Sequence, residues 1–299
     1  MSPGRLKRAA RGALYRVLSV RAVREALRPL VMARAVPFAV SRHFGFTGVF
    51  EFTLPGGEGF RYEGLPEDLL GRALYWGGLT YWEPETLRAA SVIARRARDF
   101  WDVGANTGPY TLLASAVNPG ITTWAFEPVP AVFARLRANV ALNGWAPRCH
   151  LLDVAVGRTA GPARLHVPAG PVLPTSATVD ARGFRGIRGS LVEVRTIRLA
   201  DVIDEDTPVD WVKIDVEGYE DAVLEGMGDA LGRRRPAIIV ECIPDGPGAR
   251  VERILRRFGY RFFHLTAAGP VEQVGIRPDP AEVFRNFLCV PEAKLSWIG

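Results

Sequence analysis

The sequence predicts an open α/β sheet with helices on both faces, preceded by an N-terminal extension of helix and strands. Short apolar runs alternate with helix-forming segments between residues 97 and 291, which is typical of a parallel sheet. A glycine-rich turn directly follows the first apolar run, and acidic residues end several of the runs. Because ligands bind such sheets at the carboxyl ends of their strands, the same pattern predicts a ligand site.

The first 42 residues form a basic arm, which holds ten basic residues and a single acid, Glu25. Its apolar residues recur mostly at spacings of three and four, which predicts one or two amphipathic helices. Either this helix packs on the body with a solvated basic face, or it contacts an anionic membrane surface. We expect neither a signal peptide nor a membrane-spanning helix, because arginines interrupt every apolar run.

The rest of the chain is mildly acidic, with 28 basic and 31 acidic residues. A nucleic-acid partner is therefore disfavoured, because it would need a basic surface. The three cysteines are far apart, and neither they nor the four histidines have metal-ligand spacing. This usage indicates reduced thiols in a cytoplasmic protein, with the arm as a candidate contact to the inner face of a membrane.

Residues 43–96 are expected to lead into the sheet. Residues 49–54 predict a short strand, which a Pro-Gly-Gly turn closes. An aromatic-rich segment at 75–82 follows, and then a helix from 87 to 97. The aromatic side chains either cover the hydrophobic core or form part of a wall over the site. In the second case, Glu83 faces inward.

The first strand of the sheet and the turn after it form the central motif. Residues 100–103 predict a buried strand and residues 110–117 a helix. From the end of this strand through the turn, alternate positions carry one acid, two glycines and an asparagine: Asp102, Gly104, Asn106 and Gly108. The third glycine of a dinucleotide fingerprint and the Lys-Ser/Thr pair of a P-loop are both missing. The acid suits a cationic ligand without phosphates, such as S-adenosylmethionine; the alternative is a plain strand-to-helix connection.

The next two strands are expected to complete a nucleoside site. Residues 121–126 predict a strand, which Glu127 and a proline end. Glu127 lies about twenty-five residues after the acid of the turn, where nucleotide-binding sheets place a carboxylate on the ribose hydroxyls. A helix at 131–142 and a third strand at 151–156 follow, and Asp153 or its neighbours would meet an adenine edge.

Residues 158–198 interrupt the alternation with short mixed runs, which predict an inserted hairpin or small sheet over the site. The elements expected after it are a short helix at 199–203, a strand at 209–216, a helix at 219–231, a strand at 237–240 that Glu241 ends, a helix at 248–258, strands at 260–265 and 286–290, and a tail at 292–299.

The strand at 209–216 carries charges at alternate positions. Lys213, Asp215 and Glu217 share one face of it. Charges on a central strand are unfavourable unless they are paired or functional. Lysine is rare in this chain, with three lysines beside 35 arginines, so Lys213 indicates a need for a compact ammonium. The alternative is a salt-bridged strand end that reaches solvent.

These motifs together resemble the FkbM-type family of S-adenosylmethionine-dependent methyltransferases. The resemblance rests on Asp102-Val-Gly104-Ala-Asn106-x-Gly108, Phe126-Glu127-Pro128, Ala155-Val156-Gly157, Leu199-x-Asp201 and Lys213-Ile-Asp215-Val-Glu217-Gly218-x-Glu220. It covers roughly residues 80–291 and leaves the arm aside. It implies a Rossmann-like, seven-stranded class I methyltransferase sheet over 97–291, whose last strand is antiparallel. It also implies O-methylation of a hydroxyl on a sugar, glycolipid or polyketide-type small molecule.

With this reaction as the hypothesis, roles can be assigned to the residues of these motifs and to acids near them. The residues assigned to the cofactor are Glu83, Asp102, Gly104, Asn106, Gly108, Glu127 and Asp153. Asp215 is expected to act as the base or to orient the acceptor, and Lys213 to pair with Asp215 or with the developing oxyanion. Glu217 and Glu241 complete the catalytic set. With Asp215 they are candidate ligands for Mg²⁺, which the sequence allows without requiring.

Two other functions compete with this one. A protein of the same fold could hold S-adenosylmethionine or a nucleoside without chemistry, but the charged face of Lys213, Asp215 and Glu217 argues against it. An NAD-dependent enzyme is disfavoured by the missing third glycine. The acceptor and the oligomeric state have no signal in the sequence.

Overall fold

A computed structural model describes residues 20–33, 35–36, 46–54, 56–78, 82–170, 173–174, 177 and 189–298. Most of the basic arm, part of the aromatic segment and most of residues 171–188 therefore lie outside the described residues. Within the described part of the chain, no helix is long and apolar enough to cross a membrane.

Eight strands form the main sheet, in the order β12-β11-β13-β10-β9-β3-β4-β5. They are β3 (Asp99–Val103), β4 (Thr122–Phe126), β5 (Cys149–Leu152), β9 (Trp211–Ile214), β10 (Ala237–Glu241), β11 (Tyr260–Thr266), β12 (Gly269–Gln273) and β13 (Asn286–Pro291). The strands β10, β9, β3, β4 and β5 run parallel, and β13 is antiparallel to β10. This is the expected class I methyltransferase sheet, and β12 adds an eighth strand at its edge.

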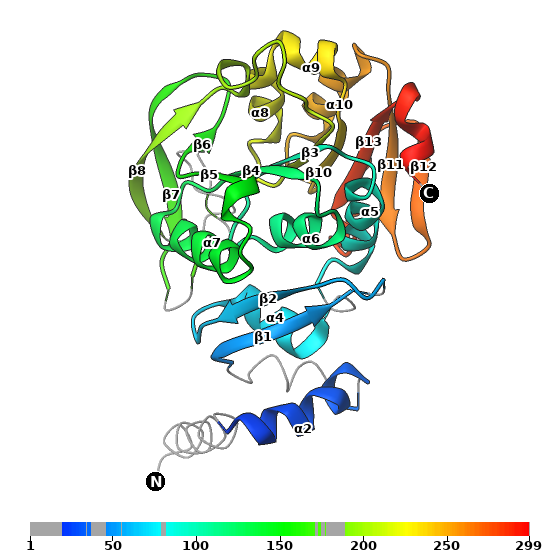
Figure 1. The fold of residues 1–299 in the computed structure, drawn as a ribbon. Helices are drawn as coiled ribbons and strands as arrows, with labels where there is room; N and C mark the ends of the chain where they lie inside the picture. Colours follow the sequence, from blue (N-terminus) through cyan, green and yellow to red (C-terminus); the bar gives the residue numbers. More distant parts are fainter. Residues whose placement is uncertain are drawn as a thin grey trace.

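Helices cover both faces of this sheet (Figure 1). α5 (Pro84–Ala94), α6 (Pro109–Val117) and α7 (Pro130–Leu142) lie on one face, and α8 (Glu220–Met227), α9 (Asp229–Arg234) and α10 (Gly248–Arg256) lie on the other. Strand parity divides the core accordingly, because neighbouring residues point to opposite faces. Phe100 and Trp211 stack in the core under α5 and α6, whereas Trp101 and Val212 belong to the core under α8 and α10.

Three expected elements differ from the structure. The strand predicted at 151–156 is split: β5 ends at Leu152, and β6 (Ala155–Val156) joins a second sheet. The helix predicted at 219–231 breaks at Gly228, whose φ of 52° is left-handed, so that α8 ends and α9 begins there. The helix predicted at 199–203 is a short 3₁₀ turn, Leu199–Asp201.

A second sheet of three strands, in the order β6-β8-β7, lies beside β5 and α7 (Figure 1). β7 (Gly161–Pro168) and β8 (Gly189–Ile197) pair antiparallel, and β6 pairs parallel with β8. Leu165 and Val194 from this sheet pack against Val129 and Val132 at the start of α7. The sheet therefore stands next to the carboxyl ends of β4 and β5.

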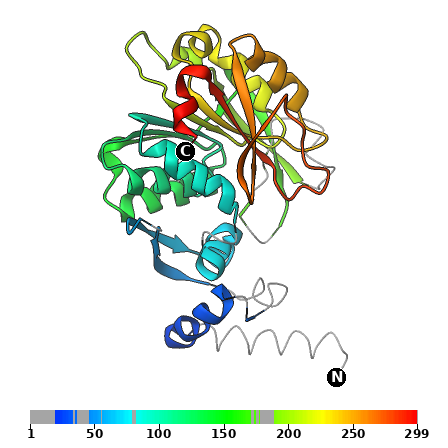
Figure 2. The same ribbon diagram turned by 90° about the vertical axis from the view of Figure 1, so that its right-hand side faces the viewer.

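The N-terminal extension lies at one end of the molecule (Figures 1 and 2). It comprises α2 (Arg21–Met32), the antiparallel strands β1 (Gly48–Thr53) and β2 (Gly59–Gly64), and α4 (Leu69–Gly77). β2 packs on α6 and α7, and α2 packs on α4. The guanidinium groups of Arg24 and Arg28 lie over the rings of Phe46 and Tyr75. In α2 these two arginines thus face the body, not solvent, which differs from the expected solvated basic face.

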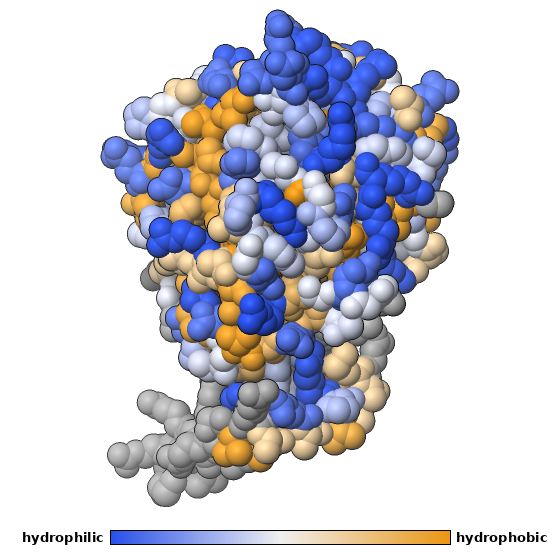
Figure 3. Space-filling model, in the orientation of Figure 1, coloured by the Kyte–Doolittle hydropathy of each residue, from blue (hydrophilic) through white to orange (hydrophobic). Residues whose placement is uncertain are grey.

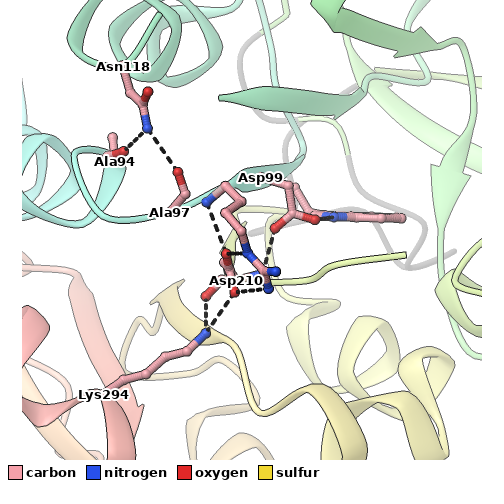
Figure 4. A network of polar contacts seen from close by, with 8 residues as sticks. Ala94, Ala97, Asp99, Asn118, Asp210 and Lys294 are labelled. Carbon is pink, nitrogen blue, oxygen red and sulfur yellow. Dashed lines mark hydrogen bonds and ion pairs between the residues drawn. The ribbon is translucent and has the colours of Figure 1, made fainter. Parts of the chain in front are cut away.

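Opposite the site, a polar network fastens the amino ends of β3 and β9 (Figure 4). Asp210 accepts hydrogen bonds from the backbone N–H and Nε of Arg98, at 3.0 and 2.9 Å, and donates its own N–H to Asp99 at 2.6 Å. Lys294 Nζ donates to the carbonyl of Asp210 at 2.8 Å. These contacts join the C-terminal segment to the strands whose other ends carry the candidate site.

Candidate functional site

The strand-end acids meet at one edge of the sheet. β3 pairs with both β4 and β9, and β9 pairs with β10, all in parallel. Asp102, Glu127, Asp215 and Glu241 therefore come together at the carboxyl edge of four neighbouring strands. Two adjoining cavities open there and share Gly104, Asn106, Asp215 and Glu217 as lining residues. A ligand that fills the first cavity thus reaches the wall of the second.

Glu127 lines the first cavity. One of its carboxylate oxygens accepts the backbone N–H of Val129 at 2.8 Å, and the other accepts that of Asn106 at 3.0 Å. Burial raises the pKa of Glu127 to about 7. Each oxygen keeps a lone pair for a further donor, so the site suits the vicinal hydroxyls of a ribose. Apolar side chains also line this cavity, among them Phe126, Val154, Val156 and Leu165.

The glycine turn fits a ligand that passes close to the backbone. Gly104 has a φ of +83°, and a Cβ built on it would lie 1.9 Å from the carbonyl oxygen of Asp215. The N–H groups of Gly104 and Ala105 both donate to the carbonyl of Phe126 at 3.0 Å. Gly108, with a φ of +97°, directly precedes α6. The turn is therefore packed closely against the ends of β4 and β9, with the Glu127 carboxylate beside it at the cavity wall.

The second cavity has a volume of about 290 Å³ and is rich in carboxylates. Five acids line it against two cations: Glu83, Asp102, Asp215, Glu217 and Glu241 against Lys213 and Arg285. Asp102 is buried and accepts a hydrogen bond of 2.6 Å from the hydroxyl of Thr111. Burial raises its pKa to about 6. The cavity thus favours a positively charged ligand group.

Lys213 is the central cation of this cavity. Its side chain is fully buried, and its Nζ donates to Asp215 at 3.0 Å while lying 5.2 Å from the centre of the Tyr110 ring. Burial alone would lower the pKa of Lys213, but the carboxylates of Asp215, Glu83 and Glu241 outweigh burial and raise it. The ammonium therefore stays charged. Strand parity correctly predicted that Lys213 and Asp215 face the same site.

Glu83 faces the cavity from a strained backbone. It has a φ of 44°, in the left-handed region, and its carboxylate accepts a short hydrogen bond from the hydroxyl of Tyr110. Burial raises its pKa. Asn106 and Glu217 also have positive φ values, 52° and 54°, and they line the same cavity. Such strain in non-glycine residues clusters at functional sites.

The candidate metal ligands are close together but already have cationic neighbours. One oxygen from each of Asp215, Glu217 and Glu241 lies within 4.8 Å of the others. Lys213 pairs with Asp215 at 3.0 Å, and Arg285 lies 3.7 Å from Glu241. Burial and the neighbouring carboxylates raise the pKa of Glu241 well above its usual value, which favours its neutral form. Lys213 and Arg285 therefore already offset part of the negative charge that an ion would balance.

The structure does not bring Asp153 to either cavity. Its side chain is exposed, whereas its neighbours Val154 and Ala155 line the first cavity. The physical reason is the early end of β5 at Leu152, after which the chain turns toward the second sheet. The wall that the described residues form on this side of the first cavity is thus apolar.

Several lining residues carried no signal in the sequence. Leu69, Leu70 and Ala73 of α4 line the second cavity together with Arg285, which precedes β13. An apolar helix face predicts burial, and nothing in it tells a cavity wall from a packed core. Arg285 is one of 35 arginines, and only the tertiary fold brings it beside Glu241.

Comparisons with known proteins cover this same region. Residues 102–262 match the family model of the methyltransferase FkbM domain. The chain is 32% identical over 187 residues to the 31-O-demethyl-FK506 methyltransferase FkbM of Streptomyces tacrolimicus, covering 54% of this chain and 71% of the relative. It is 30% identical over 155 residues to the hexuronic acid methyltransferase AglP of Haloferax volcanii, covering 50% of this chain and 58% of the relative.

Among solved structures, an FkbM methyltransferase from Methylobacillus flagellatus aligns with a TM-score of 0.44 and 18% identity. The alignment covers 65% of this chain and 43% of the solved one. The family match extends over more than half of the chain and includes the glycine turn, Glu127 and the segment around Lys213. This chain therefore belongs to the FkbM family of S-adenosylmethionine-dependent methyltransferases.

Proposed function

We propose that this chain transfers a methyl group from S-adenosylmethionine to a hydroxyl oxygen of a small molecule of the sugar, glycolipid or polyketide type. The observation that carries the proposal is the pair of adjoining cavities with Asp215 on their common wall. One cavity suits a nucleoside, and the other contains carboxylates and a buried ammonium. When bound, the sulfonium of the cofactor supplies an electrophilic methyl group.

The residues of the chain then have distinct roles. Glu127 holds the ribose hydroxyls, and the backbone of Gly104 to Gly108 passes beside the cofactor, whose positive charge the Asp102 carboxylate attracts. Asp215 accepts the proton of the acceptor hydroxyl as methyl transfer proceeds. Lys213, which donates to Asp215 at 3.0 Å, orients that carboxylate. Holding the acceptor oxygen in line with the methyl group is the larger part of the catalysis.

The charge of the second cavity supports a neutral acceptor. Its lining has five acids and two cations, so a carboxylate on the acceptor is disfavoured wherever more than two of these acids are ionised. The relative from Haloferax volcanii is named for a hexuronic acid, and that property is not proposed for this chain. Trp82 lines the same cavity and offers an aromatic face to the apolar side of a neutral sugar or polyketide.

The cofactor assignment is tested by calorimetric titration of the full chain with S-adenosylmethionine, S-adenosylhomocysteine and NAD. We expect micromolar affinity for the two sulfur nucleosides and none for NAD. Glu127→Ala should abolish this binding, because it removes the acceptor for two backbone N–H groups and for the ribose. Glu272→Ala is the control, since that acid is exposed on β12. A preference for NAD would refute the assignment.

The catalytic role of Asp215 is tested by transfer of a radiolabelled methyl group to a panel of neutral sugars, uronic acids and polyketide alcohols. With an active acceptor, Asp215→Asn should lower kcat by about 10²–10⁴-fold, as expected for the loss of a general base. Binding of S-adenosylhomocysteine should stay unchanged. Asp153→Asn, at an exposed position just after the end of β5, is the control and should keep full activity. Near-normal turnover of Asp215→Asn would contradict the role.

We further propose that the extension contacts an anionic membrane surface. Val20, Leu30 and Met32 are about half exposed on α2, and apolar surface is visible at this end of the molecule (Figure 3). The first 42 residues carry eight bases besides Arg24 and Arg28, and basic side chains complement anionic lipid. Vesicles that contain phosphatidylserine should therefore sediment the wild type, and pure phosphatidylcholine vesicles should not. The double variant Leu30→Asp/Met32→Asp should stay in the supernatant, and equal sedimentation of both proteins would refute the contact.

A further inference from the structure

A buried chain of hydrogen bonds joins the N-terminal extension to the glycine turn. The hydroxyl oxygen of Tyr62, on β2, lies 2.7 Å from a carboxylate oxygen of Asp68 and 2.6 Å from the hydroxyl oxygen of Thr107. All three residues are at most 1% exposed. A carboxylate only accepts hydrogen bonds, so Tyr62 donates to Asp68, and Thr107 in turn donates to Tyr62. Tyr62 and Asp68 both lie outside the segment that matches the family.

Thr107 is held on three sides by these and other contacts. Besides the hydroxyl bond to Tyr62, its N–H donates to the side chain of Asn106 at 2.8 Å, and its carbonyl accepts from Asn139 at 3.0 Å. The side-chain oxygen of Asn139 accepts the backbone N–H of Glu63 at 3.0 Å. Two successive residues of β2 therefore fix Thr107, one directly and one through Asn139.

The residues on either side of Thr107 have an unfavourable backbone conformation, which contacts with the rest of the protein must maintain. Asn106 has a φ of 52° and Gly108 a φ of +97°. A non-glycine residue keeps such a conformation only where its surroundings determine it. The N–H of Asn106 donates to Glu127 at 3.0 Å, so a relaxed turn would also release the carboxylate proposed to hold the ribose.

The other end of the chain of hydrogen bonds reaches the wall of the second cavity. Asp68 caps α4 by accepting the N–H of Gly71 at 2.8 Å, and Leu69, Leu70 and Ala73 of this helix line the cavity. The contact is tight, because a Cβ on Gly71 would lie 2.5 Å from Asp68 and 2.7 Å from the Tyr62 ring. The position of α4 and that of the glycine turn are thus determined together.

We propose that Tyr62 and Asp68 are positioning residues, which hold the cofactor-binding turn in its strained conformation through Thr107. The inference rests on the proposed use of this turn for the cofactor. It makes the extension a part of the binding site, although the extension contributes no residue to the matched segment.

The test is a double-mutant cycle on the full chain, with the Kd of S-adenosylhomocysteine as the readout. Tyr62→Phe and Thr107→Val each keep the packing and remove one side of the hydrogen bond between these two residues, and Tyr62→Phe also removes the hydrogen bond to Asp68. Each is expected to weaken binding roughly 5- to 10-fold, as for one buried hydrogen bond. The double variant should bind no more weakly than Tyr62→Phe alone, because Thr107→Val then removes no further contact between these two residues.

Tyr260→Phe is the matched control. Tyr260 is also buried, and its hydroxyl donates to the carbonyl of Pro236 at 2.9 Å, outside the lining of both cavities. Its loss should lower the Tm and leave the Kd unchanged, which separates positioning from general stability. If Tyr62→Phe does not fold, Asp68→Asn replaces it, because asparagine still caps α4 but turns a donor toward Tyr62.

An unchanged Kd in Tyr62→Phe or Asp68→Asn would overturn the inference, as would fully additive losses in the double variant. A wild-type chain that does not bind S-adenosylhomocysteine would instead refute the proposed function, so the two failures are distinguishable.

Discussion

Replacing Lys213 by methionine is expected to lower the free energy of unfolding of the ligand-free protein by about 3–5 kcal/mol near pH 8. This is the usual cost of leaving one partner of a buried ion pair uncompensated. The lysine side chain is fully buried, and its ammonium pairs with Asp215 at 3.0 Å. Methionine has a similar length but carries no charge. The carboxylates of Glu83 and Glu241 would also lose this nearby cation.

The loss is expected to shrink as the pH falls from about 8 to about 5. Burial already raises the pKa of Glu83 and of Glu241 in the wild type, and removal of the ammonium raises both further. A carboxyl group whose pKa is raised by folding binds more protons in the folded state, so its unfavourable effect grows as the pH rises through that range. Protonation at low pH therefore removes most of the repulsion that the substitution creates.

Urea unfolding at pH 5 and at pH 8 measures this difference. Lys294→Met is the matched control, because Lys294 pairs with one acid, Asp210, that also keeps its contacts with Arg98. We expect a loss of roughly 1 kcal/mol there, with a weaker dependence on pH. Equal losses for Lys213→Met at both pH values would mean that the buried carboxylates do not depend on this lysine.

The parts of the site that follow from local sequence could be predicted. A buried strand, a glycine turn and a helix are contiguous in the chain, so Asp102, Gly104 and Gly108 could be placed without tertiary information. Lys213 and Asp215 are two residues apart at a strand end, and strand parity puts them on one face. Glu217 shows the limit of this argument. β9 ends at Ile214, and Glu217 reaches the cavity through a left-handed turn with a φ of 54°.

Contacts between distant segments could not be predicted. Tyr62 and Thr107 are 45 residues apart, and the hydrogen bond between them depends on how β2 packs against α6. Asp153 itself lines neither cavity, whereas its neighbours Val154 and Ala155 line the first one, because one apolar run supplies both β5 and β6 to different sheets. Periodicity describes a strand, but it does not say where the strand leaves its sheet.

Gly104→Ala is expected to weaken binding of S-adenosylhomocysteine by on the order of 100-fold or more. Its φ of +83° disfavours any side chain, and the added Cβ would lie 1.9 Å from the carbonyl oxygen of Asp215. That atom belongs to backbone whose N–H donates to Val103 at 3.0 Å. The clash can therefore be relieved only by separating the ends of β3 and β9, which displaces the glycine turn and Asp215 together.

Two other glycines separate conformational strain from the clash. Gly144 has a φ of +72°, and a Cβ added there would meet no atom within 4 Å, so Gly144→Ala should cost about 1–2 kcal/mol of stability and leave the Kd unchanged. Gly108 has a φ of +97°, and the one close contact of its Cβ would be with the end of the Leu136 side chain, at 2.7 Å. Because a side chain can move where backbone cannot, calorimetry should rank the loss of affinity as Gly104 first, Gly108 second and Gly144 last. An affinity loss at Gly144 equal to that at Gly104 would show that left-handed strain alone, and not the contact with Asp215, explains the requirement for glycine in the turn.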